Sequence, residues 1–160
     1  MKRILSLLCC LLLWVGGSAV QAQSKTTQAF HKDHEDAFTL FFYNNTLKML
    51  NATENEAFNE LVDDIDKMKL LRIDKSAAAF SKEDYKQLIK DYQKESFESL
   101  MNVKQKDMRF DVYIKEKDNI TEGLVVLIDE GTNLSILDIK GAVPLDRLAE
   151  LFETVSKIRN

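Results

Sequence analysis

The chain is poor in the residues that most often cross-link proteins or carry out chemistry. Its 160 residues include two cysteines, one proline, five glycines and two histidines. Cys9 and Cys10 lie in an early apolar run that we expect to be removed, which leaves no disulfide, no thiol nucleophile and no thiolate metal site. Gly16 and Gly17 leave with that run, and the other glycines form no glycine-rich phosphate loop.

The sequence also lacks a basic stretch. Lysine and arginine number 22 against 26 aspartates and glutamates, so the formal net charge is −4. Binding to phosphate backbones or anionic lipids needs clustered cations, and every basic cluster in this sequence has acidic neighbours. We therefore expect no nucleic acid among its partners.

The first 22 residues have the pattern of a secretory signal peptide. Basic residues at Lys2 and Arg3 precede an apolar run, Ile4–Val15, and small residues then lead to Ala22. A membrane-spanning helix needs about 20 apolar residues, and this run is shorter and ends at a glycine pair. We expect cleavage after Ala22 and no transmembrane segment in the mature chain.

The position of the cysteines argues against a lipid anchor. A lipoprotein signal carries its modified cysteine after the apolar run, whereas Cys9 and Cys10 lie inside it. We therefore expect an exported protein, periplasmic or secreted, without a lipid anchor. Residues 23–28 are polar and are predicted to form a disordered tether, and residues 29–160 have the size of a single α+β domain.

Helical spacing of apolar residues dominates the first half of that domain. It predicts a helix from about Thr27 to Leu50 and, after a capping box at Thr53–Glu56, a second helix that ends near Met68. These two helices are expected to form a hairpin. Lys69–Asp74 is predicted to be a short buried strand, and Ser81–Asp84 is predicted to cap a third helix that ends near Lys94.

The second half changes to an alternating pattern. From Ser96 to Gly141, apolar and polar residues alternate, which predicts a four-stranded antiparallel meander. Leu124–Ile128 is continuously apolar and is expected to be a central strand covered on both faces. Pro144 then begins a predicted C-terminal helix that packs on the sheet. Because strands are grouped rather than alternating with helices, the fold class is predicted to be α+β.

One sequence cluster has the residue types of a metal site. His31 and His34, spaced three apart, would lie on one side of a helix, beside carboxylates such as Glu35. No third histidine is present, and a solvated, charged helix start has the same composition. The metal site is therefore a hypothesis beside the simpler interpretation of an exposed helix turn.

No catalytic residue can be assigned from the remaining sequence. The acidic pairs resemble solvated faces or helix caps, and no Gly-x-Ser-x-Gly motif is present. Asp138 lies within an apolar run, and we expect its side chain to point outward from an edge strand. No cofactor is expected.

An aromatic segment is the remaining candidate for a binding surface. Phe38, Phe41 and Phe42 lie in the first predicted helix, which has apolar residues on more than one face. Burial between the second helix and the sheet explains this composition, and we favour it. The alternative is an exposed surface for a partner or an apolar ligand.

Several of these segments resemble one known family. Lys69–Ile73, Phe97–Met101, Val112–Lys115, Leu124–Leu127 and Ile139–Gly141, behind a signal peptide and a helical first half, resemble the family called domain of unknown function 4252. The resemblance implies an exported cell-envelope protein of Bacteroidota, with no assigned activity and no catalytic residues to carry over. Many similar proteins look like lipoproteins, and this chain differs in lacking a cysteine after the apolar run.

The absence of a catalytic cluster and the aromatic segment together favour a non-enzymatic binding or interaction module. Its partner would be an envelope protein or a small apolar ligand. The alternative is a metal-assisted hydrolase that uses His31 and His34, and a third hypothesis is a structural protein that self-associates. The sequence does not indicate an oligomeric state.

Overall fold

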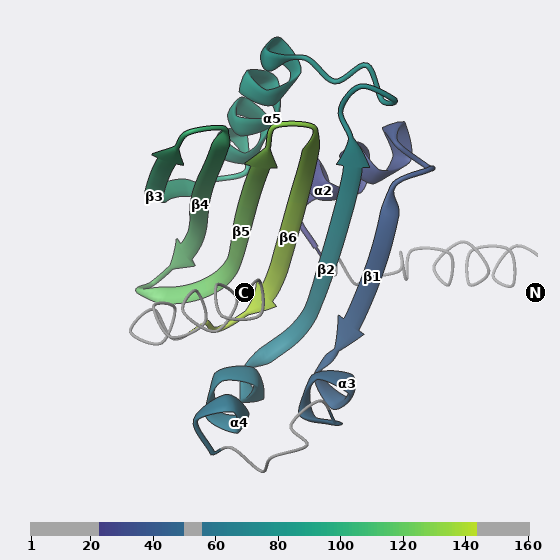
Figure 1. Ribbon diagram of the computed structural model, residues 1–160. Coiled ribbons are helices and arrows are strands. Elements are labelled where there is room, and N and C mark those ends of the chain that lie inside the picture. The colour runs from purple at the N-terminus through teal and green to yellow at the C-terminus, as the bar shows by residue number, and fades with distance from the viewer. Residues whose placement is uncertain (1–22, 50–55, 144–160) are drawn as a thin grey trace, which may run out of the picture.

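The computed structural model describes residues 23–49 and 56–143 (Figure 1). The elements in chain order are α2 (Lys25–Asp33), β1 (Phe38–Tyr43), α3 (Asn44–Met49), α4 (Glu56–Asp63), β2 (Ile65–Asp74), α5 (Lys82–Lys94), β3 (Glu98–Gln105), β4 (Met108–Lys117), β5 (Ile120–Glu130) and β6 (Asn133–Gly141). The strands form one antiparallel sheet in the order β1-β2-β6-β5-β4-β3.

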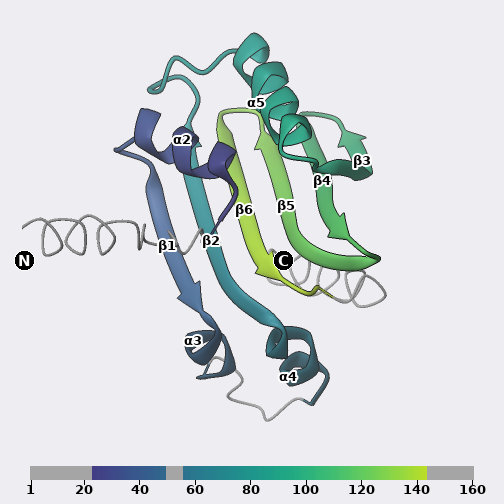
Figure 2. The same cartoon turned by 180° about the vertical axis from the view of Figure 1, so that it is seen from behind.

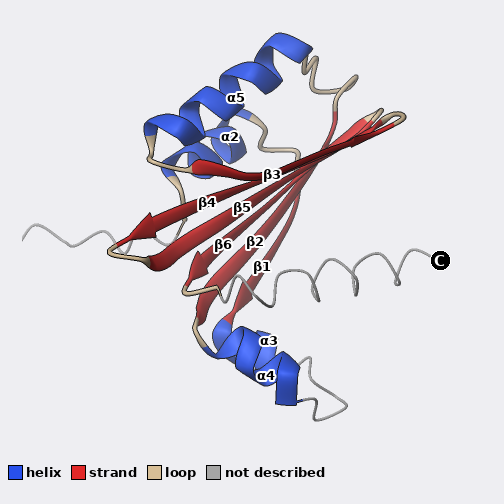
Figure 3. Cartoon of the chain, turned by 90° about the vertical axis from the view of Figure 1, so that its left-hand side faces the viewer, coloured by secondary structure: helices blue, strands red, loops and turns tan. Residues whose placement is uncertain are grey.

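The predicted fold class is wrong in its architecture. The sheet has six strands rather than four, because β1 and β2 extend the meander from the β6 side. No helical hairpin precedes the sheet in the described residues: α2 and α5 cover one face, and the short helices α3 and α4 lie at one end of the sheet (Figures 2 and 3). The predicted C-terminal helix and the signal peptide lie outside the described residues.

The largest error concerns residues 27–50, which were predicted to form one helix. The structure ends α2 at Asp33 and makes Phe38–Tyr43 the edge strand β1. Five of those six strand residues are aromatic or β-branched, types that favour extended backbone. Because nearly every position is apolar, the segment fits a helical period and a strand period equally well. Periodicity alone therefore could not decide between a helix and a strand.

The second predicted helix is also shorter than expected. It ends at Asp63, and Ile65 and Met68 belong to β2 instead. The side-chain amide of Asn44, at the start of α3, donates to the backbone oxygens of Val62 at 2.8 Å and Ile65 at 2.9 Å. These two bonds tie the residue directly after β1 to the end of α4 and to the start of β2.

The predicted cap of the third helix and the predicted central strand are confirmed. Ser81 caps α5, and its side chain and that of Asp84 form the reciprocal bonds of a capping box. Residues 118 and 119 join β4 to β5 with positive φ at both positions, the geometry of a tight hairpin turn. β5 is central, and Leu124–Leu127 are buried with alternate residues facing the two sides of the sheet.

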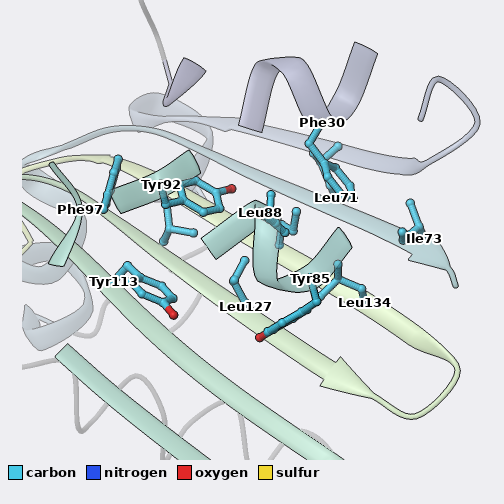
Figure 4. Packing of buried hydrophobic residues seen from close by; sticks show 12 residues of the cluster. Phe30, Leu71, Ile73, Tyr85, Leu88, Tyr92, Phe97, Tyr113, Leu127 and Leu134 are labelled. Atoms are coloured by element: carbon cyan, nitrogen blue, oxygen red, sulfur yellow. The ribbon is translucent and has the colours of Figure 1, made fainter. Parts of the chain in front are cut away.

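The sheet separates two apolar clusters. The first lies under α2 and α5 and contains Phe30, Leu71, Leu88, Tyr92 and Leu127 among its buried members (Figure 4). The second lies on the opposite face and joins the sheet to α3 and α4 through Leu47 and Val62. Burial of each large apolar side chain contributes roughly 1.5–3 kcal/mol, so the sheet is stabilised from both sides.

Residues 23–28, predicted to be a disordered tether, have a different role in the structure. Ser24 caps α2, and residues 25–28 form the first turn of that helix. The backbone N–H of Lys25 donates to the Glu95 carboxylate at 2.8 Å, and the backbone and hydroxyl of Thr26 also donate to it. A carboxylate at a helix N-terminus satisfies free N–H groups and the helix dipole, so Glu95 anchors α2 onto the end of α5.

Candidate functional site

β1 is the edge of the sheet and exposes most of its large side chains. It pairs with β2 and is the terminal strand in the sheet order. Phe38 and Tyr43 are each 56% exposed and Phe41 is 50% exposed. Among residues 23–49 and 56–143 no strand pairs with the outer side of β1, so these aromatic side chains flank an edge whose N–H and C=O groups are offered to another strand.

The exposed side chains of β1 lie on both faces of the strand. Phe41 is opposite Lys69 in the β2 register and shares the α2 face with Tyr43. Phe38 and Leu40 lie on the opposite face, beside the half-buried Phe42, which packs on the second apolar cluster. β1 therefore packs Phe42 against the core and has exposed apolar side chains on both of its faces.

The other edge of the sheet is protected in ways that β1 is not. β3 begins with Glu98, ends with Lys104 and Gln105, and has an irregular register between Ser99 and Met101. Charges and bulges are the usual means by which proteins prevent edge-to-edge pairing. β1, with the sequence FTLFFY, has no charge and no break in its register. The two edges therefore differ in their readiness to accept another strand.

A chain of hydrogen bonds lies directly behind Phe41. The ammonium of Lys69 lies 2.9 Å from His31 Nδ1, and His31 Nε2 lies 3.2 Å from the Thr39 hydroxyl, which donates to the Ala37 carbonyl at 3.0 Å. Because an ammonium can only donate, Nδ1 accepts and the ring proton is on Nε2. These hydrogen bonds thus fix the tautomer of His31 and link α2 to β1 and β2.

Phe41 covers these hydrogen-bonded side chains from the solvent side. Its ring centroid lies 5.0 Å from the Lys69 ammonium and 6.3 Å from the His31 ring. Lys69 is only 3% exposed, and burial lowers the pKa of its ammonium, opposed by the nearby Asp138 carboxylate. The cation–π contact compensates part of the lost hydration.

Asp138 is buried, and the prediction that it points outward is wrong. It is 2% exposed and lies opposite Lys69 in the β2–β6 register, on the face covered by α2. The backbone N–H of Ser24 donates to its carboxylate at 3.2 Å and the Ser24 hydroxyl donates at 2.8 Å. Burial raises the pKa of Asp138, while these bonds favour its charged form.

This buried carboxylate ends a second polar chain. The hydroxyls of Ser24 and Thr27 are 2.7 Å apart, and those of Thr27 and Tyr92 are 2.8 Å apart. Tyr92 is fully buried between α5 and the sheet (Figure 4). Asp138 therefore has a structural partner set that joins the N-terminal cap of α2 to the core.

The two histidines have separate partners in the structure. His34 stacks on Phe30 with a centroid distance of 4.2 Å, and its Nδ1 lies 2.9 Å from the Phe30 carbonyl. His31 is engaged with Lys69 and Thr39 on the other side. Among residues 23–49 and 56–143, no three His, Cys, Asp or Glu side chains gather as a metal site would require. The metal-assisted hydrolase stays a prediction that no observation here favours.

Of the predicted binding residues, Phe38 and Phe41 are exposed and Phe42 is half-buried, all on β1 rather than on a helix. Burial, the interpretation that we favoured for this segment, is wrong for Phe38 and Phe41. Lys69 could not be singled out from the sequence, because a lysine in a short strand is usually solvent-exposed and only the strand register places it opposite Asp138.

We expect His31 to make the stability of the fold depend on pH. Burial and the neighbouring Lys69 ammonium lower the pKa of His31 below 6.5, opposed by Glu35. At pH values between the pKa of His31 in the folded protein and 6.5, His31 is protonated in the unfolded chain but neutral in the folded one. The free energy of unfolding therefore rises as pH rises through that range.

Urea denaturation from about pH 5 to about pH 7.5 would measure this dependence. The variant His31→Gln is expected to lose that part of the slope, whereas His34→Gln keeps it. Equal slopes for His31→Gln and the unaltered chain would contradict the assignment.

A family model described as "Domain of unknown function (DUF4252)" matches residues 30–151. This range includes all six strands of the sheet. No curated protein and no solved structure matches the chain. In the residues described, no helix is long and apolar enough to cross a bilayer.

Proposed function

The chain belongs to this family of unknown function, and from that premise we propose that it is an exported, non-enzymatic module of the cell envelope that binds a partner protein along β1. The partner contributes an extended segment that pairs with the free edge of β1. The basic, apolar and small-residue order of residues 1–22 supports the export part of the proposal.

The observation that carries the proposal is an edge strand, β1, that has exposed aromatic side chains, no charged residue and no break in its register. Added strands gain affinity from main-chain hydrogen bonds and specificity from contacts with alternate side chains. Phe41 and Tyr43 are available on one face of β1, and Phe38 and Leu40 on the other. Large aromatic side chains bury much area for little entropy, which suits them to partner recognition.

This geometry favours a protein over a small apolar ligand. Small-molecule sites are concave and surround most of the ligand. Side chains on two opposite faces of one strand, such as Phe38 and Tyr43, cannot converge on a single small molecule. A strand that lies alongside β1 contacts both faces at once.

The rigid setting of β1 supports the same function. Phe42 is packed on the second core cluster, and Asn44, directly after the strand, is bonded to the end of α4 and the start of β2. Thr39 is held by His31 and Ala37. A partner therefore meets a strand that is already ordered, which lowers the entropy lost on binding.

The proposal predicts that charge on β1 prevents association without unfolding the protein. Phe38→Lys and Tyr43→Lys each replace an exposed side chain, so the circular dichroism spectrum should not change. Each variant should weaken partner binding by about tenfold or more, since a charge desolvated within an interface costs at least about 1.4 kcal/mol. Leu100→Lys, on the exposed part of β3, is the matched control and should bind normally.

Association can be read from the native size of the protein after gentle extraction from its own cells. The unaltered chain and Leu100→Lys should elute in one complex with a second, stoichiometric protein, whereas Phe38→Lys and Tyr43→Lys should elute as the lone chain. Elution of the unaltered chain alone, or only with copies of itself, would contradict the proposal.

A further inference from the structure

Basic side chains that are far apart in the sequence meet at one end of the sheet. A hollow of about 470 Å³ lies between the start of α5, the loop after β2 and the β3–β4 turn. Its lining includes six cations, Lys75, Lys82, Lys86, Lys104, Lys106 and Arg109, and two carboxylates, Asp107 and Asp129. This local excess contrasts with the net charge of −4 for the whole chain.

Two of the cations form the fixed wall of the hollow. Arg109 Nε lies 2.7 Å from the buried carboxylate of Asp111, and its guanidinium lies 5.0 Å from the centre of the Tyr85 ring. Lys75 pairs with Asp129 at 2.5 Å, with both side chains largely covered. These groups hold the shape of the site and have little charge left to offer.

The remaining cations are available to a ligand. Lys86 has only a long, exposed contact of 3.7 Å with Glu83. In the described part of the chain, Lys82, Lys104 and Lys106 form no ion pair. Even with the ion-pair partners Asp111 and Glu83 counted, six cations face four carboxylates around the hollow.

The backbone of Lys106 is a second, independent observation. Its φ is +51°, in the left-handed region that glycine or asparagine occupies at lower cost. A lysine in this conformation costs about 1 kcal/mol relative to a residue suited to it. The turn therefore holds a cation at the rim of the hollow where a different residue would fold more easily.

We propose that this hollow binds a small soluble anion that carries two or more phosphoryl groups. The volume suits a ligand of that size, and lysine ammonium groups bind phosphoryl oxygens as point charges from several directions. Lys82 and Lys86 approach from α5, and Lys104 and Lys106 from the β3–β4 hairpin, so a ligand with more than one charge contacts both sides.

The site is independent of the surface proposed for a partner protein. β1 is at one edge of the sheet, and the β3–β4 hairpin is at the opposite edge. Failure of either proposal leaves the other standing. The sequence did not indicate this site, because its cations are spread over residues 75–109 and most of them have an acidic residue close by along the chain.

Isothermal titration calorimetry with tripolyphosphate tests the site directly, at about 50 mM salt so that screening is modest. The purified protein should bind one tripolyphosphate with a Kd below about 1 mM. Lys106→Asn should weaken binding at least about threefold. The same variant should unfold at an equal or higher denaturant concentration, because asparagine tolerates the left-handed turn.

Lys90→Gln, an exposed lysine of α5 outside the lining, is the matched control and should bind as the unaltered chain does. The double variant Lys82→Gln/Lys104→Gln should lose affinity further. The proposal is overturned if tripolyphosphate gives no binding heat, if Lys106→Asn leaves the affinity unchanged, or if Lys90→Gln weakens binding as much.

Discussion

Replacing Gly141 by alanine should destabilise the fold by about 4 kcal/mol, a large part of the stability of a small domain. Gly141 ends β6 with φ +133°, a conformation that side chains other than glycine rarely adopt. A Cβ at this position would lie 2.2 Å from the Asp64 carbonyl oxygen and 2.8 Å from Ile65 Cα. Both atoms are backbone at the start of β2, so neither can rotate away.

Gly131→Ala is the control for this prediction. Gly131 also has a positive φ, +63°, but no atom lies within 4 Å of the position that its Cβ would occupy. Alanine there should cost only about 1 kcal/mol, from backbone conformation alone. Urea denaturation followed by circular dichroism measures both values, and similar losses for the two variants would contradict the close approach of β6 to β2.

Asp111→Ala should destabilise the protein by about 3 kcal/mol, because it leaves a cation without its partner. Asp111 is buried on β4, and its carboxylate accepts a hydrogen bond from the Tyr85 hydroxyl at 2.7 Å and lies 2.7 Å from Arg109 Nε. Asn102 of β3 also donates to it. Its loss would therefore weaken the attachment of α5 and of β3 together.

Asp63→Ala provides the matched control for the loss of an ion pair. Asp63 pairs with Lys48 at 2.7 Å, but both side chains are about half exposed. Such pairs contribute about 0–1 kcal/mol, so this variant should unfold close to the unaltered chain. A loss for Asp111→Ala as small as that for Asp63→Ala would show that the polar cluster does not hold α5 on the sheet.

The second half of the fold could be predicted because each of its signals has one interpretation. Strict alternation from Met108 to Lys115, a tight turn at residues 118–119 and a continuous apolar run at Leu124–Leu127 identify strands whose order follows the chain. The start of α5 was equally clear, because Ser81 and Asp84 have a local capping role that depends on no distant residue.

The first half could not be predicted because its signals are ambiguous without the tertiary structure. Phe38–Tyr43 is apolar at nearly every position, and only pairing with β2 selects the strand. The position of Asp138 depends on Ser24, more than a hundred residues away, which provides the hydrogen bonds that make burial tolerable. Local patterns contain no information on such distant compensation.

For the candidate sites too, the sequence indicated residue types but not their place in the tertiary structure. The sequence singled out Phe38, Phe41 and Phe42 as candidates, but assigned them to a helix and favoured burial, whereas they lie on an edge strand. It could not indicate that β1 is the terminal strand of the sheet, since strand order depends on the pairing of β2 with β6. Exposure of the aromatic residues follows from that order.

Site-specific photo-crosslinking in the native cells tests the central proposal most directly. A photoreactive residue is placed at Phe38 or Tyr43 on β1, and at Leu100 on β3 or Ile120 in the β4–β5 hairpin as controls, all four being exposed apolar positions. We predict that both β1 positions crosslink to neighbouring residues of one extended segment in the same second protein, while the controls do not. Absence of crosslinks from β1, equal crosslinking from β3, or crosslinks only to copies of this chain would contradict the account.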